Sequence, residues 1–110
     1  MTTTIIEVPK ESFEAVKQYK QQPVYFFRFD GEETENDTIV CSETTITLHG
    51  AKYDTMVSAL IATKYSEDAQ IALLFNYQND AEQYAEQMME YQAWRMYCKE
   101  SARAFFGREQ

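Results

Sequence analysis

The chain has 110 residues, of which 45% are hydrophobic and 15% aromatic, so it can bury the core of one domain without metal or disulfide staples. Its 18 acidic residues outnumber its 10 basic ones and leave a net charge of −8. That balance argues against direct binding to nucleic acid or to an anionic membrane surface, because both need a clustered cationic face.

The sequence predicts neither membrane attachment nor secretion. No apolar run approaches the roughly 18 residues that a membrane span needs. The N-terminus lacks the basic and long apolar regions of a signal peptide, so a cytoplasmic location is expected.

Cys41 and Cys98 lie far apart in the sequence. Reduced, buried thiols are the default for such a pair, although a disulfide stays open.

The start of the chain predicts a strand followed by a helix. Residues 3–8 are rich in β-branched side chains and end at Pro9, which is typical of a strand. Residues 10–22 place apolar side chains at helical intervals, and Pro23 would end that helix because the residue before a proline disfavours the α conformation.

Residues 24–29 are the densest aromatic segment and predict a strand with one face against the core. The Asp-Gly pair at 30–31 predicts a turn, and residues 32–37 predict a polar, acidic loop.

Two further strands are predicted at 38–41 and 44–48, around a turn at 42–43. The second alternates threonine with apolar residues, which is the period of a half-exposed sheet. Together these segments indicate an antiparallel meander of three strands, with residues 3–8 as its fourth strand.

After Gly50 the hydrophobic period becomes helical. Residues 53–64 carry a wide apolar stripe at intervals of three and four, which predicts an amphipathic helix. Ser66, with two acidic residues after it, predicts the N-cap of a second helix. That helix would stop near Asn79, and its apolar residues are Ile71, Leu74 and Phe75.

The last helix is predicted to be long. Asn79 or Asp80 can cap it in a capping-box pattern, no proline or glycine follows before Phe106, and Gly107 would supply the stop. At about 1.5 Å per residue this helix would span about 40 Å. The fold class is therefore α+β in a single domain over 1–110. Residues 1–49 are mainly β with one helix, and residues 50–110 form three helices.

The long helix is the most informative part of the sequence. Its apolar residues recur at alternating intervals of three and four, which is the seam of helix–helix packing. Either the helix is shared with another chain, or it lies across the sheet with Tyr and Met at the edge of the contact. The predicted contact surface consists of Tyr84, Met88, Tyr91, Trp94, Arg95 and Cys98.

Acidic residues occupy the first half of this helix and basic residues the second, and complementarity to the helix dipole is the simplest cause. Like charges also repeat at i, i+4 intervals, where they repel modestly. An antiparallel neighbour would relieve that repulsion, so an antiparallel homodimer is the hypothesis. The two rows are Glu82, Glu86 and Glu90, and Arg95, Lys99 and Arg103.

No catalytic, cofactor or metal motif emerges. The single histidine, His49, excludes a multi-histidine metal site and is expected in a loop or at a strand end. A nucleophilic pair of His49 with either cysteine has no positive support, and the three glycines form no phosphate-binding loop. The aromatic strand favours core packing over base stacking. The sequence therefore predicts a protein without enzymatic activity or cofactor.

The acidity admits two interpretations, of which solubility is the simpler. The alternative is an acidic regulatory or inhibitory protein that imitates nucleic acid and binds a basic partner. Its surface would consist of Glu32, Glu33, Glu35, Asp37, Glu82, Glu86 and Glu90. A third hypothesis is a small-molecule pocket lined by the surplus tyrosines and phenylalanines.

Four segments of the second half carry a resemblance to known proteins. They are Val57-Ser58-Ala59-Leu60-Ile61, Lys64-Tyr65-Ser66-Glu67-Asp68, Asn76-Tyr77 and Tyr91-Gln92-Ala93-Trp94-Arg95. These segments resemble small uncharacterised proteins of gut Bacteroidetes, some of which sit among phage-like genes. The resemblance covers roughly residues 52–105 and implies a phage or prophage context, without any functional residue.

The leading hypothesis is a non-enzymatic structural, assembly or protein-interaction module that associates through its long C-terminal helix.

Overall fold

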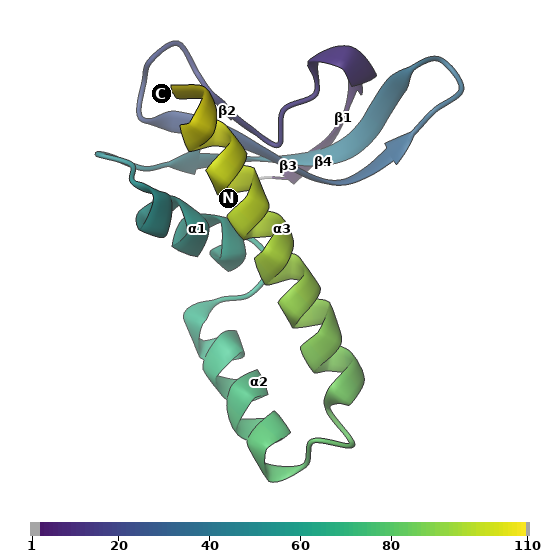
Figure 1. Ribbon diagram of the computed structural model, residues 1–110, viewed down its shortest axis with the longest axis vertical. Helices are drawn as coiled ribbons and strands as arrows, with labels where there is room; N and C mark the ends of the chain where they lie inside the picture. The colour runs from purple at the N-terminus through teal and green to yellow at the C-terminus, as the bar shows by residue number, and fades with distance from the viewer. Residues whose placement is uncertain (1–2, 110) are drawn as a thin grey trace.

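The computed structural model describes residues 3–109. Within them, a four-stranded antiparallel sheet precedes three helices, the last of which is long, so the predicted α+β class is confirmed (Figure 1). The elements in chain order are β1 (Thr3–Pro9), the 3₁₀ turn η1 (Lys10–Ser12), β2 (Val16–Gln18), β3 (Val24–Glu33), β4 (Thr38–Thr47), α1 (Tyr53–Ala62), α2 (Glu67–Asn79) and α3 (Ala85–Glu109).

The strands lie in the order β1-β4-β3-β2. The N-terminal strand therefore pairs with β4, as the fourth strand expected from the sequence. The predicted turn at 42–43 is wrong, because β4 is one continuous strand. Glu43 pairs with Thr4 on one side and Arg28 on the other. Hydrogen bonds to β1 and β3 thus keep residues 42–43 extended, although their local sequence favours a turn.

The predicted N-terminal helix over 10–22 is also wrong. The segment instead contains η1 and the short strand β2, which pairs with β3. Lys20 and Gln21 adopt positive φ angles of 46° and 61° and turn the chain from β2 into β3. An isolated helix of this length is marginal in water, whereas pairing with the aromatic strand buries Val16 in the core.

Strand β3 continues past the predicted turn at 30–31. Its register with β4 slips between Phe29 and Glu32, so this pair forms a β-bulge rather than a turn. Asp30 takes a positive φ of 54°. A Cβ atom on Gly31 would lie 3.0 Å from the Ile39 side chain, so the strands approach here more closely than a larger residue comfortably allows.

The core lies between one face of the sheet and helices α1 and α3 (Figure 1). Tyr25, Phe27 and Phe29 alternate along β3 and are buried on that face. The Trp94 ring of α3 lies 5.6 Å from the Phe27 ring and 5.3 Å from the Phe29 ring, centroid to centroid. Further along α3, Phe105 meets Tyr25 edge to face at 5.6 Å. The long helix therefore crosses the sheet along its aromatic strand.

The helix starts largely follow the predicted signals. Helix α1 agrees with the stripe read from 53–64, and the Ser66 hydroxyl caps α2 by accepting the Ala69 N–H at 3.1 Å. The Asp80 carboxylate accepts the Gln83 N–H at 3.1 Å, but regular α-helix begins only at Ala85. The expected stop at Gly107 is wrong, because the helix continues through it at a cost of only about 1 kcal/mol.

Helix α2 and the first half of α3 form a hairpin that projects away from the sheet (Figure 1). We call α2 and residues 80–92 the arm. At its base, the Tyr91 hydroxyl donates a 2.6 Å hydrogen bond to Gln70, and the Tyr91 ring packs edge to face on Tyr65 at 5.0 Å. Among the described residues, no helix has the length and apolar character needed to cross a membrane.

The burial of Phe27 predicts a large stability effect. Phe27→Ala leaves a cavity between β3 and α3, so we expect a loss of about 3–5 kcal/mol in the free energy of unfolding. Ile5→Ala is the control, because Ile5 is 70% exposed and Phe27 0%. Urea denaturation of both variants checks the difference. Equal losses would contradict the core described above.

The pH dependence of stability should report the burial of Tyr97. Burial raises the pKa of Tyr97 from its ordinary 10.0 to about 12, so the folded state favours the protonated phenol. The contribution of the protonated Tyr97 phenol to the free energy of unfolding is complete below pH 10.0 and is lost as the pH rises toward 12.

Tyr97→Phe removes this titration together with the 2.7 Å hydrogen bond to the Arg28 carbonyl. We expect the variant to be about 1 kcal/mol less stable at neutral pH. Above pH 10.0 it should lose less stability than the wild type. Denaturation across this range measures both effects, and identical pH profiles would refute the assignment.

Candidate functional site

The predicted contact seam of the long helix packs within its own chain. Met88, Tyr91, Trp94 and Cys98 are buried against the sheet, α1 and α2, while Tyr84 and Arg95 are partly exposed. The Trp94 indole N–H donates to the Ile61 carbonyl at 3.2 Å, which fixes α3 to the end of α1. The buried side chains of the seam therefore belong to the core of this chain and are not available to contact a second chain.

Glu82 precedes α3. Glu86 and Glu90 lie on the opposite side of α3 from the basic row, because an α-helix turns by about 100° per residue. Glu90 borders a hollow beside Asp30, whereas Arg95 and Lys99 border another hollow beside α1. One partner helix laid along α3 would therefore not face both rows.

The predicted acidic residues separate into two groups. Glu32, Glu33, Glu35 and Asp37 lie at the β3–β4 hairpin, whereas the row Glu82–Glu90 lies on the arm. The hairpin and the end of the arm are at opposite extremes of the molecule (Figure 1). Within the hairpin group, Glu33 is neutralised by Lys10 at 3.1 Å. The continuous acidic surface that a mimic of nucleic acid would need is thus interrupted.

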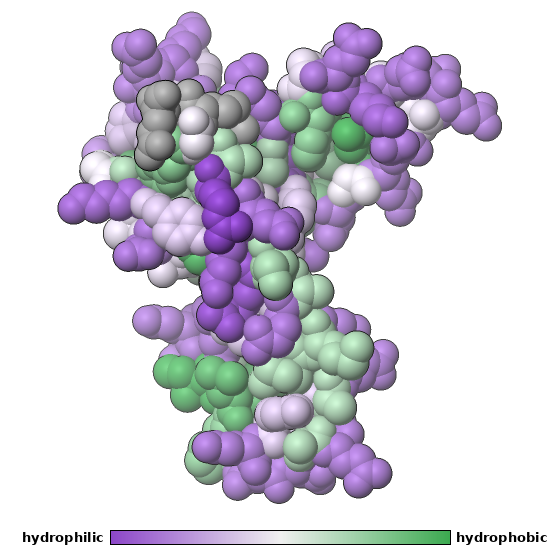
Figure 2. Space-filling view, viewed as in Figure 1, coloured by the Kyte–Doolittle hydropathy of each residue, from purple (hydrophilic) through white to green (hydrophobic). Residues whose placement is uncertain are grey.

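An exposed apolar row on α2 is the surface that sequence reasoning missed. Ile71, Leu74 and Phe75 were expected as the apolar residues of this helix, yet they are 63%, 49% and 63% exposed. Of the α2 residues, all of which the structure describes, Leu73 is the buried one, on the side that faces α3. Figure 2 shows hydrophobic residues gathered over the arm.

A hollow of about 460 Å³ lies beside this row, where α1, α2 and α3 meet. The Arg95 guanidinium sits 5.8 Å from the centre of the Tyr91 ring. Among the described side chains, neither Arg95 nor Lys99 forms an ion pair with a carboxylate. The side chains that line this hollow include Asp54, Val57, Ile61, Leu74, Arg95 and Lys99.

The two cysteines are poorly suited to nucleophilic catalysis. Burial raises the pKa of the Cys98 thiol from its ordinary 9.0 to about 12, and burial likewise raises the pKa of Cys41. Both are free thiols, and His49 is exposed after β4. A thiol that stays protonated is a weak nucleophile. Within the described residues, no group of His, Cys, Asp and Glu gathers as metal ligands would.

No protein-family model, curated protein or solved structure matches this chain.

Proposed function

We propose that this chain is a non-enzymatic protein-interaction module that self-associates through its arm. The observation that carries the proposal is the row Ile71, Leu74 and Phe75, which is exposed at helical spacing on one side of α2. Burying a side chain of this kind stabilises by roughly 1.5–3 kcal/mol relative to full exposure. A row of three on a projecting hairpin is the arrangement in which one helix docks on another.

A second copy of this chain is the partner that the charges favour. Helix α2 contains Glu67 and Asp68 and no basic residue. The hollow beside it offers Arg95 and Lys99 without carboxylate partners among the described side chains. The α2 helix of a second copy, laid in this hollow, would bury its apolar row and bring its acidic start to these two cations.

Such a contact repeats symmetrically, because each copy offers both the row and the hollow. It moves the predicted interface from the seam of the long helix to α2 and keeps Arg95 within it. After the entropic cost of association we expect a dissociation constant on the order of micromolar. The resemblance to Bacteroidetes proteins implies a phage or prophage setting for this assembly.

Substitution of the apolar row should separate the copies. We expect Ile71→Ser to weaken self-association by at least tenfold, since each buried isoleucine contributes on the order of 1.5–3 kcal/mol and a symmetric dimer contains two. Ile5→Ser is the matched control, because Ile5 is 70% exposed on the edge strand β1, away from the arm. Light scattering behind size exclusion, across a dilution series, reads the mass of each protein. A wild type that stays monomeric at every concentration would refute the proposal.

Charge reversal tests the orientation of the contact. Arg95→Glu should weaken association while leaving the monomer folded, because Arg95 is only partly buried. Adding Glu67→Arg to that variant should restore part of the loss, as expected for charges that meet across an interface. Sedimentation equilibrium measures each association constant. If the double variant associates no more tightly than Arg95→Glu, Arg95 and Glu67 do not meet across the interface. The Ile71→Ser experiment then still tests whether the dimer forms through α2.

A further inference from the structure

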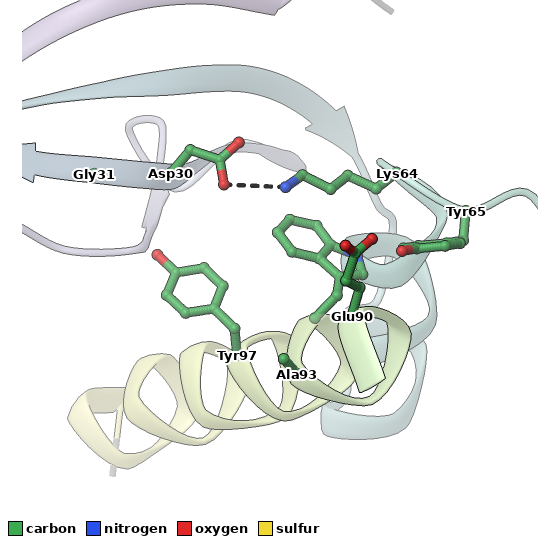
Figure 3. A pocket seen from close by; sticks show the side chains of 8 residues that line it. Asp30, Gly31, Lys64, Tyr65, Glu90, Ala93 and Tyr97 are labelled. Carbon is green, nitrogen blue, oxygen red and sulfur yellow. Dashed lines mark hydrogen bonds and ion pairs between the residues drawn. The ribbon is translucent and has the colours of Figure 1, made fainter. Parts of the chain in front are cut away.

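A second hollow of about 540 Å³ lies on the other side of α3, between that helix and β3. The bulge of β3 supplies Asp30, and the segment between α1 and α2 supplies Lys64 and Tyr65 (Figure 3). On the opposite wall, α3 supplies Glu90, Trp94 and Tyr97, and Gly31 and Ala93 complete the lining. Three elements distant in the sequence thus converge on one cavity of ligand size.

The Lys64 ammonium already occupies this hollow in the manner of a bound cation. Its Nζ atom lies 4.3 Å from the centre of the Trp94 ring and 5.4 Å from that of Phe29. The same atom forms an ion pair with the Asp30 carboxylate at 3.0 Å (Figure 3). An aromatic face with a carboxylate beside it is the recognition pattern for ammonium and guanidinium groups.

The remaining charges in the lining favour a further positive charge. Asp30 and Glu90 give two carboxylates against the single ammonium of Lys64. Among the described side chains, Glu90 has no ion pair. Its negative charge is felt inside the hollow, where Tyr65 also lies. The pKa of Tyr65 is raised mainly by burial and, to a smaller extent, by the Glu90 carboxylate. An anion drawn to Lys64 would have to displace Asp30 and approach Glu90, so an anionic ligand does not fit.

We propose that this hollow binds an organic cation, either an ammonium or a guanidinium group. Trp94 forms the aromatic wall, Asp30 and Glu90 supply the counter-charges, and Lys64 is a tethered competitor that must move aside. Lys64 is well suited to leave, because its side chain is 36% exposed and its stem is flexible. The proposal is independent of self-association, since the hollow and the α2 row lie on different sides of α3.

Trp94 provides a direct readout, because it is the one tryptophan of the chain. Tetramethylammonium chloride is the probe, titrated against sodium chloride at equal ionic strength, with Trp94 fluorescence as the signal. Saturation-transfer NMR on the methyl protons of the probe records the same binding without relying on fluorescence. We expect saturable binding by the probe and no comparable response to sodium.

The sign of the Lys64 effect distinguishes a competitor from a binding residue. Lys64→Ala frees the Trp94 face and the Asp30 carboxylate, so the affinity for tetramethylammonium should rise on the order of tenfold. Glu90→Gln should weaken binding by about two- to fivefold, as for an exposed charge pair. Glu86→Gln, which removes a charge from the same row outside the hollow, should leave binding unchanged. Circular dichroism of each variant checks that the fold is intact.

The source of the cation is resolved by a second probe. A short peptide with acetylated N-terminus, amidated C-terminus and a central lysine whose side-chain ammonium is free is compared with tetramethylammonium and free cadaverine. Tighter binding by the peptide would assign the hollow to a side chain of a protein partner, and tighter binding by cadaverine would assign it to a small amine. If Lys64→Ala binds none of the three probes by fluorescence and NMR, or binds more weakly than the wild type, the proposal is wrong.

Discussion

The structure depends on the packing of Trp94 into the aromatic face of β3. The indole ring contacts Phe27 and Phe29, and its N–H donates to the Ile61 carbonyl. One side chain therefore joins the sheet, α1 and α3. The neighbouring Tyr97 adds a second tie, because its hydroxyl donates to the Arg28 carbonyl. Since aromatic pairs contribute beyond their buried area, this cluster fixes where the long helix crosses the sheet.

The length of α3 then determines the surfaces that remain. A helix of 25 residues spans about 37 Å, and its first half extends beyond the sheet (Figure 1). Helix α2 folds back onto that extension through Leu73 and leaves Ile71 and Phe75 in solvent. The two hollows lie on either side of α3, one bordered by Arg95 and the other by Glu90. The interface and the cation site that we propose both follow from this excess length.

The elements whose signals are local were predictable. The amphipathic stripe of α1 and the Ser66 cap of α2 specify their own structure, because side-chain period and capping act within one or two turns. Residues 10–22 and 42–43 were mispredicted because strand pairing with distant segments outweighs weak local preference. The candidate interaction surface was predictable only in part. Arg95 remains in it, whereas Tyr91, Trp94 and Cys98 are consumed by the core.

The sequence by itself determined the class of the fold, the aromatic strand and the long terminal helix, since composition and period are properties of the chain alone. It also placed Glu86 and Glu90 in one row of α3 and the basic residues in another. Only the tertiary structure decided which apolar face is left exposed, because α1 and α3 cover the sheet and α2 buries Leu73 against α3 instead. It likewise brought Asp30, Lys64 and Trp94 to one hollow. That convergence depends on a β-bulge and a helix crossing, and neither leaves a periodic pattern in the amino-acid sequence.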